Sequence, residues 1–242
     1  MAKILVENLS LQFRVYHDGS SSTKEYFANL LRGRKHNGYT DFWALRDVSF
    51  CVKDGERIGI VGHNGAGKST LLRTVSRIYE PTAGKLQVDG RIAPLLEIGA
   101  GFHPEFTGRE NIYFNGAILG YTRSQLREIE DEIIQFAELE QFIDTPVKYY
   151  STGMYMRLAF SLATTVHPDI LILDELFVGG DASFVRRGKE RMNRMIDRSS
   201  VMVLVSHDHA LLRSLCDRFL WLDHGKLVAD GGAKVLDEYA SR

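Results

Sequence analysis

Residues 56–70 read ERIGIVGHNGAGKST, and this stretch decides the fold. The run 56–62 is short and apolar, and turn residues bound it on both sides, which is typical of a buried strand in a parallel sheet. A glycine-rich loop follows at once, and the pattern from Lys68 predicts a helix over 68–78. The order strand, loop, helix begins a β-α unit and therefore favours an α/β fold.

The loop also matches the phosphate-binding pattern G-x-x-x-x-G-K-[ST], from Gly62 to Ser69. Glycines allow a tight wrap that turns backbone N–H groups inward, and the helix N-terminus adds the positive end of its dipole. Lys68 is expected to reach the β- and γ-phosphates, and the Ser69 hydroxyl to bind Mg²⁺. We expect nucleotide contacts along the whole loop, namely Gly62, Asn64, Gly65, Ala66, Gly67, Lys68, Ser69 and Thr70.

Working outward, strands and helices alternate at both ends of the chain. Strand patterns cover 3–13, 43–52, 85–98, 169–176 and 200–207, and two short strands lie within 218–228. Helical patterns fill 108–145, including a short piece at 140–144, and return at 151–166, after each of the strands 169–176 and 200–207, and at 234–239. The alternation predicts a parallel sheet with helices on its faces and a helical block set into it.

A pair of acids follows the apolar run Ile170–Leu173. Ligands bind at the carboxyl ends of strands in open α/β sheets. There Asp174 would hold Mg²⁺ and Glu175 would orient and polarise the attacking water. A solvated pair at a strand end is the ordinary alternative, but the upstream phosphate loop favours the catalytic interpretation.

Two further segments have a structural and a functional interpretation. His207 ends another apolar strand and would contact the γ-phosphate, although a lone histidine has many uses. The segment Tyr150–Met154 lies just ahead of the helical run MRLAFSLATTV at 156–166, and Ser151 there is either a plain N-cap or part of a second anion site.

Composition excludes several classes of protein. Hydrophobic residues make up 44% and charged residues 25%, as in ordinary globular domains, and 30 Lys and Arg against 31 Asp and Glu give a net charge of −1. Nucleic-acid proteins usually carry a basic excess, so we expect no nucleic-acid partner. The sequence shows neither a signal peptide nor an apolar run of membrane-spanning length.

Taken in order, these motifs resemble the nucleotide-binding subunits of ATP-binding cassette (ABC) transporters. The resemblance covers essentially the whole chain. It implies a P-loop NTPase fold with a RecA-like core of mainly parallel sheet, an N-terminal antiparallel β part and an inserted helical subdomain. Residues 1–242 would then form one nucleotide-binding domain, with a family insertion at 16–41 and the helical subdomain at 103–165.

The resemblance also implies roles for individual residues, with ATP and Mg²⁺ as ligands. Glu175, His207 and Lys68 would be catalytic, and Ser69, Glu97 and Asp174 would hold the metal. An aromatic ring would lie under the adenine, and Phe13 and Trp43 compete for that place. In a homodimer, each ATP would be shared with the partner's signature segment, which is Ser151, Thr152, Gly153 and Met154, and Asp181 would lie in the loop that crosses the interface.

Departures from the general family pattern narrow the resemblance. The signature reads YSTGM, and Glu97 stands where the family usually has Gln, within a run continuing as GFHPEFTGREN. These are similar to ATPase subunits that export lipid-linked polysaccharides, and the insertion fits the O-antigen and teichoic-acid branch. We therefore expect an ATPase powering O-antigen-type export from the cytoplasmic face of the bacterial inner membrane, with two copies of a permease. Because the sequence stops at Arg242, we expect no C-terminal carbohydrate-binding domain.

Some points stay open at this stage. Phe102 and Phe106 are either permease contacts or core residues. The insertion helix with Tyr26 and Phe27 either lies near the membrane surface or is a solvated hairpin. Transport of teichoic acid, capsule, lipid or drug, a soluble ABC ATPase and an idle regulatory cassette are the alternative functions; the retained Lys68 and Glu175 speak against the idle cassette.

Overall fold

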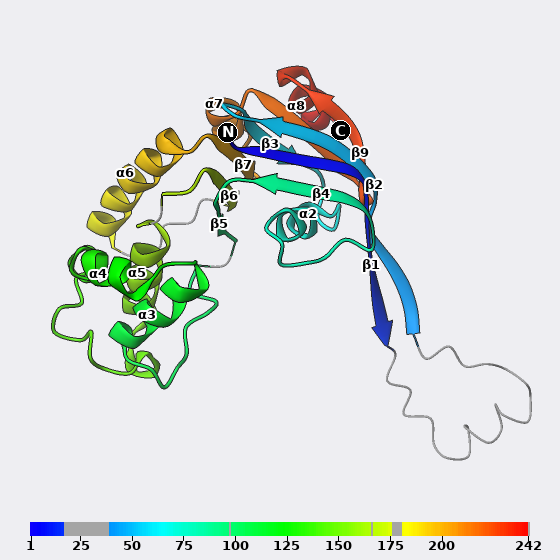
Figure 1. The fold of residues 1–242 in the computed structure, drawn as a ribbon. Coiled ribbons are helices and arrows are strands. Elements are labelled where there is room, and N and C mark those ends of the chain that lie inside the picture. Colours follow the sequence, from blue (N-terminus) through cyan, green and yellow to red (C-terminus); the bar gives the residue numbers. More distant parts are fainter. Residues whose placement is uncertain (17–38, 97, 166, 176–180, 242) are drawn as a thin grey trace, which may run out of the picture.

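The computed structural model describes residues 1–16, 39–96, 98–165, 167–175 and 181–241. Its N-terminal part is a three-stranded antiparallel sheet in the order β2-β1-β4, built from β1 (Lys3–Tyr16), β2 (Tyr39–Lys53) and β4 (Ala83–Asp89). The two long strands β1 and β2 extend together toward one side of the molecule (Figure 1).

A six-stranded sheet forms the centre, in the order β5-β6-β7-β3-β8-β9. The strands are β5 (Ile92–Leu95), β6 (Ile170–Asp174), β7 (Val201–Val205), β3 (Arg57–Val61), β8 (Arg218–Asp223) and β9 (Lys226–Gly231). All neighbours pair in parallel except β8 and β9. Every residue of β7 is buried, which explains why the central strands read as continuous apolar runs rather than alternating ones.

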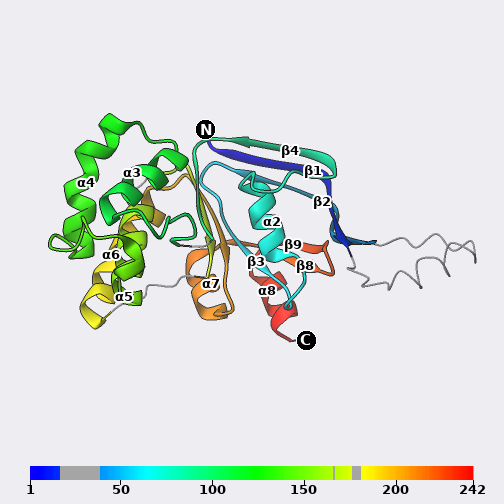
Figure 2. The same cartoon turned by 90° about the horizontal axis from the view of Figure 1, so that it is seen from below.

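Two apolar clusters cover the two faces of this sheet. On one face, alternate residues such as Ile58 and Ile60 pack with the antiparallel sheet and with α2 (Lys68–Val75). On the other face, residues such as Leu171 and Leu173 pack with α6 (Ala182–Arg198), α7 (His209–Leu215) and α8 (Ala233–Ala240). The result is a layered α/β core (Figure 2).

A separate helical group lies beside the sheet in both views (Figures 1 and 2). It contains α3 (Gly108–Ile118), α4 (Arg123–Ala137), a 3-10 turn (Val147–Tyr149) and α5 (Thr152–Ala163), and it has an apolar cluster of its own. Thr107 and Thr122 begin α3 and α4 with capping boxes, which satisfy free N–H groups at both helix starts.

The α/β fold with a mostly parallel sheet and an antiparallel part is confirmed. The expected helix at 140–144 is wrong: Phe142 and Thr145 donate to the third carbonyl before them, which makes turns, and Pro146 disfavours helix in the residue before it. The expected strand 85–98 is two strands, β4 and β5, that belong to different sheets. The helix expected over 68–78 ends at Val75.

Other expectations fall outside the described residues. These are the insertion helix with Tyr26 and Phe27, most of the 16–41 insertion, Glu97, and the stretch 178–180 ahead of Asp181. Among the helices described, none has the length and apolar character needed to cross a membrane.

Candidate functional site

The proposed catalytic residues meet at one edge of the central sheet. Strands β6, β7 and β3 are neighbours and run in parallel, so their carboxyl ends lie together. Asp174 is the last residue of β6 and Glu175 follows it, His207 lies after β7, and the loop that leads to Lys68 follows β3. Both acids act electrostatically on the Lys68 ammonium. The sequence order alone could not place β6 two strands from β3.

The loop from Gly62 to Gly67 depends on glycine conformations. Gly62 has φ 153°, and a Cβ there would lie 2.3 Å from the carbonyl oxygen of Leu222. Gly67 has φ 103° and is the N-cap of α2, where a Cβ would lie 2.9 Å from the Ala44 carbonyl oxygen. The left-handed backbone and the close backbone neighbours explain why side chains are not accommodated at these two positions.

Lys68 is buried under the loop it belongs to. Its Nζ donates to the carbonyl oxygens of Gly62 at 2.6 Å and His63 at 3.0 Å. Burial lowers the pKa of Lys68, and the nearby charges of Asp174 and Glu175 oppose that shift. The ammonium is therefore held in place, with its charge facing the ends of β3 and β6.

Glu175 and His207 form a pair at the ends of adjacent strands. His207 Nε2 lies 3.5 Å from Glu175 Oε1, and both side chains are more than half exposed. Glu175 has φ 59°, a left-handed conformation that is unusual for a residue with a side chain. Its N–H donates to the Val205 carbonyl at 2.9 Å, which fixes this conformation against β7. The sequence placed both residues at strand ends, and the structure brings their side chains together.

Sequence reasoning missed the β8–β9 turn, which braces the phosphate loop. The Gly225 N–H donates to the Ala66 carbonyl at 2.9 Å, and the Gly225 carbonyl accepts from the Arg46 N–H at 2.8 Å. Asp223 lies 2.7 Å from His63 Nε2, the His63 side chain being part of the loop. The sequence signal here was the His224-Gly225 turn itself, and nothing in that dipeptide indicates that it contacts the phosphate loop.

The signature segment lies at the start of α5, in the helical group. Ser151 is the N-cap, and its hydroxyl accepts from the Met154 N–H at 3.2 Å. Thr152 and Gly153 are exposed. Figures 1 and 2 show α5 in the helical group beside the sheet and α2 apart from it, packed against the core, so the structure does not bring the signature to the phosphate loop within one chain.

The remaining predicted residues lie on other elements, among them α6 and β1. Asp181 is the N-cap of α6; the Ser183 hydroxyl and the N–H groups of Ser183 and Phe184 lower the pKa of Asp181 to about 2. Phe13 packs edge-on against Tyr79, with ring centroids 5.3 Å apart.

Trp43 lines a cavity of about 540 Å³ that extends to Gly65 in the phosphate loop. Ser69 and Thr70 are half-buried in the first turn of α2, and Asn64 is exposed in the loop. Trp43 and the phosphate loop therefore line the same cavity.

The family model for the ABC transporter matches residues 45–178, more than half of the chain. The chain belongs to the ABC transporter family. Among curated proteins, an O-antigen export system ATP-binding protein RfbB of Myxococcus xanthus is 45% identical over 95% of this chain. A Klebsiella pneumoniae protein of the same name is 38% identical over 96% of this chain and 94% of its own length. A teichoic acids export ATP-binding protein TagH of Lactococcus lactis is 39% identical over 98% of this chain.

Coverage differs among these relatives. The chain spans 53% of the Myxococcus xanthus protein, 63% of an Aeromonas salmonicida ABC transporter protein AbcA and 50% of the Lactococcus lactis protein. Among solved structures, a dimeric post-hydrolysis state of an ATP-binding cassette bound to ADP and Pi aligns with a TM-score of 0.67 at 20% identity, covering 95% of this chain and 98% of that one. That likeness concerns the fold alone, and it agrees with the ABC cassette architecture.

Proposed function

We propose that this ABC family member is the ATP-hydrolysing subunit of an exporter of lipid-linked, O-antigen-type polysaccharide. The observation that carries the ATPase part is the convergence of Lys68, Asp174, Glu175 and His207 at neighbouring strand ends. The substrate class is supported by the relatives named for O-antigen export, which match nearly the whole chain at 38–45% identity. A relative named for teichoic acid export supports that polymer as the second candidate.

ATP would bind with its phosphates along the loop from Gly62 to Thr70. The loop N–H groups and the N-terminus of α2 supply positive partial charge, and Lys68 supplies a full one. The donor set fits Mg²⁺, because the Ser69 hydroxyl and the Asp174 carboxylate are oxygen ligands of the kind this ion prefers. Mg²⁺ would neutralise phosphate charge there, and Glu97 stays a proposed third ligand.

Glu175 would hold the attacking water and draw a proton from it. Its fixed left-handed backbone points the carboxylate away from β6, toward His207. His207 would keep the carboxylate oriented and contact the γ-phosphate. These two roles place the chemistry on side chains that are exposed, so a closing partner has to exclude water from them.

A second copy of the chain would supply that closure. Ser151, Thr152 and Gly153 of the signature segment are exposed and Met154 is half-buried, and the start of α5 lies away from the phosphate loop of its own chain, as Figures 1 and 2 show. In a head-to-tail homodimer each signature segment would contact the ATP held by the other chain. Asp181 would lie in the loop that crosses the dimer interface. ATP then favours the closed dimer only to the extent that it binds the closed dimer more tightly than the open form. Hydrolysis of ATP removes that preference.

Adenine recognition rests on two aromatic candidates. The shared cavity with Gly65 supports Trp43, whereas the packing of Phe13 on Tyr79 gives that ring a structural partner already. Because the two strands pair Gln12 with Trp43, the rings lie on neighbouring strands. Quenching of Trp43 fluorescence by ATP in the wild type, lost in Trp43→Phe, would assign the contact.

The permease would dock on the helical group at an apolar groove of about 170 Å³. The groove runs between residues 98–102, α3 and α5, and Phe102 lines it. At its rim Ile118 and Leu119 are exposed, 66% and 39% respectively. Phe106 makes an edge-to-face contact with Phe114. Phe102 and Phe106 are both half-buried, so each can pack within the protein and also contact the permease. A cytoplasmic helix of the permease would occupy this groove and so hold the subunit at the cytoplasmic face of the inner membrane.

The ATPase proposal is tested with the purified chain. Glu175→Gln keeps the side-chain size but removes the base, so it should bind ATP and form a stable dimer without turnover. Size-exclusion chromatography with Mg·ATP should show a dimer for Glu175→Gln and none for Lys68→Ala. Equal ATP hydrolysis by Glu175→Gln and the wild type would contradict the assigned chemistry.

A further inference from the structure

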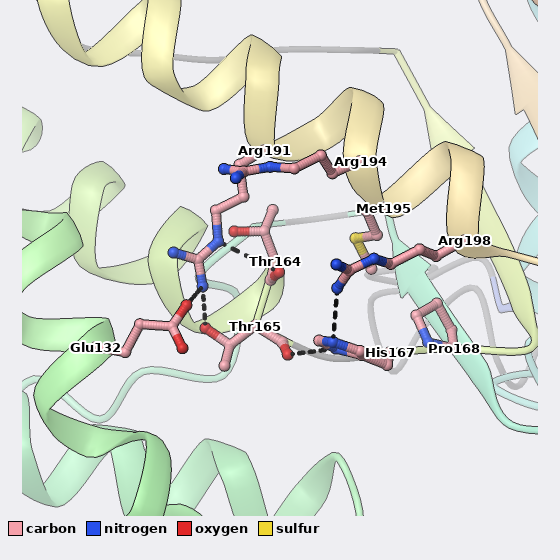
Figure 3. A pocket seen from close by; sticks show the side chains of 9 residues that line it. All are labelled: Glu132, Thr164, Thr165, His167, Pro168, Arg191, Arg194, Met195 and Arg198. Atoms are coloured by element: carbon pink, nitrogen blue, oxygen red, sulfur yellow. Dashed lines mark hydrogen bonds and ion pairs between the residues drawn. The ribbon is translucent and has the colours of Figure 1, made fainter.

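A second cavity, of about 160 Å³, lies between the core and the helical group, away from the phosphate loop. One wall is α6, and the other is made by Thr164, Thr165, His167 and Pro168, which lie between α5 and β6 in the sequence. Glu132 of α4 closes one side (Figure 3). The cavity therefore touches elements from both parts of the molecule.

Four arginines of α6 share one face of that helix. Arg187, Arg191, Arg194 and Arg198 are spaced by four, three and four residues, which places them in one row along the helix. The row borders the buried face that contains Phe184 and Met195. At one end the row faces the helical group, and at the other end Arg198 contacts His167.

Acids of the helical group pair with the first half of this row. Arg187 donates to Glu138, and Arg191 Nη2 lies 2.9 Å from Glu132 Oε1. Arg191 also donates to the Thr165 hydroxyl at 2.7 Å. The first two arginines thus each have a carboxylate partner.

The second half of the row has no carboxylate partner within the described residues. Arg194 and Arg198 form no ion pair there, and both line the cavity. The Arg198 guanidinium donates to His167 Nε2 at 3.1 Å, and His167 Nδ1 donates to the Thr165 carbonyl at 3.1 Å. An imidazole that accepts at one nitrogen and donates at the other is neutral, so it balances none of the positive charge.

The cavity consequently has an excess of positive charge in a partly enclosed place. Three guanidiniums face one carboxylate. Arg191 is only 8% exposed. Burial lowers the pKa of Arg191, Glu132 opposes the shift, and the charge of Arg194 adds to it. An anion placed between Arg194 and Arg198 would relieve this repulsion.

We propose that this cavity is a binding site for a phosphate or pyrophosphate group. Guanidinium forks recognise the oxygens of such groups with paired hydrogen bonds, and donors converge here from one helix and from the opposite wall. The anion comes either from solution or from the headgroup of a lipid phosphate. This inference does not depend on the exported substrate, since it uses none of the residues assigned to ATP.

Occupancy of the site would tie the helical group to the core. Arg194 and Arg198 belong to α6 of the core, and Thr164 and Thr165 of the opposite wall directly follow α5 of the helical group. A ligand that binds the folded arrangement and not the unfolded chain raises the melting temperature with its concentration. The predicted consequence is stabilisation by the free anion even when the phosphate loop is filled.

The test is calorimetric titration of inorganic pyrophosphate into the full chain saturated with ADP. The variant Arg194→Gln/Arg198→Gln should bind at least about tenfold more weakly than the wild type. The control Arg186→Gln/Lys189→Gln removes the same charge from positions of the same helix that do not line the cavity, and it should bind within about twofold of the wild type. Pyrophosphate should also raise the melting temperature of the wild type and the control, but not of the cavity variant.

A second arm separates the two sources of the anion. Phosphatidylcholine vesicles with and without phosphatidic acid are tested for co-sedimentation with the same three proteins. If the wild type and the control bind free pyrophosphate and the cavity variant does not, the anion is a soluble one. If the wild type and the control bind the vesicles with phosphatidic acid and the cavity variant does not, the anion is a lipid headgroup. If neither probe binds, or if the cavity variant binds as well as the control, the proposal is overturned, and circular dichroism shows that the variants are folded.

Discussion

Replacing Gly225 with alanine tests how the β8–β9 turn supports the phosphate loop. Gly225 has φ 77°, and its N–H and carbonyl bond to Ala66 and Arg46 respectively. A Cβ at this position would lie 2.6 Å from the carbonyl oxygen of Ala44. Backbone cannot move aside as a flexible side chain can, so the turn has to shift, and the bond to the loop at Ala66 shifts with it.

The expected loss of stability has two parts. A left-handed conformation costs a residue with a side chain about 1–2 kcal/mol relative to glycine. Forcing an extra carbon against packed backbone adds about 1–3 kcal/mol. We therefore expect Gly225→Ala to lower the free energy of unfolding by about 2–5 kcal/mol.

The assay is urea unfolding of the variant beside a matched control, Gly55→Ala. Gly55 has a similar φ of 85°, but a Cβ there would meet nothing within 4 Å. The control should lose only the backbone part, about 1–2 kcal/mol. ATP affinity, measured on protein that is still folded, should fall about threefold to tenfold in Gly225→Ala because a supporting hydrogen bond of the loop weakens, and it should not change in Gly55→Ala.

Two results would refute this reasoning. One is equal destabilisation of Gly225→Ala and Gly55→Ala, which would mean that the turn relaxes freely. The other is unchanged ATP affinity in a destabilised Gly225→Ala, which would mean that the turn does not support the loop.

Three further predictions concern single side chains. Glu175→Gln should lower kcat for ATP hydrolysis by about 10²–10⁴-fold and leave the ATP dissociation constant within about twofold, as steady-state kinetics and titration would show; a parallel loss of affinity would point to a binding role instead. The pKa of Asp181 is lowered from 3.8 to about 2 by the bonds to Ser183 and Phe184, so its ionised form stabilises the folded state above about pH 4, and this contribution is lost as the pH falls toward about 2. Urea midpoints of Asp181→Asn should therefore fall less across that window than those of the wild type, and parallel curves would contradict the assignment. Burial raises the pKa of the Cys216 thiol to about 12, so iodoacetamide at about pH 8 should label it only after unfolding; rapid labelling of the folded protein at Cys216, identified by mass spectrometry, would disagree.

The central sheet could be predicted from the sequence because each of its strands has a recognisable local pattern. Apolar runs such as 57–61 and 201–205 are buried on both faces, and the acids and histidine that follow them fall at strand ends. The phosphate loop was equally readable, because its spacing and its place between strand and helix are a local property.

What failed depended on contacts distant in sequence. The run 85–98 looks continuous, yet β4 pairs with β1 while β5 pairs with β6, a choice made by partners 80 or so residues away. Gly225 and Asp223 support the loop more than 150 residues upstream, and no local pattern marks them. The short piece at 140–144 has helical composition, but the Ile143 carbonyl accepts from the Arg109 N–H of α3 rather than from a residue of its own segment.

The central claim, that ATP hydrolysis at Glu175 powers polysaccharide export, is tested most directly in cells whose only copy carries Glu175→Gln. Cells with Glu128→Gln, a change of the same kind at an exposed position of α4, are the control. We expect Glu175→Gln cells to accumulate lipid-linked glycan inside and to lose their surface polysaccharide, while control cells keep it. An unchanged surface coat in Glu175→Gln cells would contradict polysaccharide export as the function of this ABC subunit.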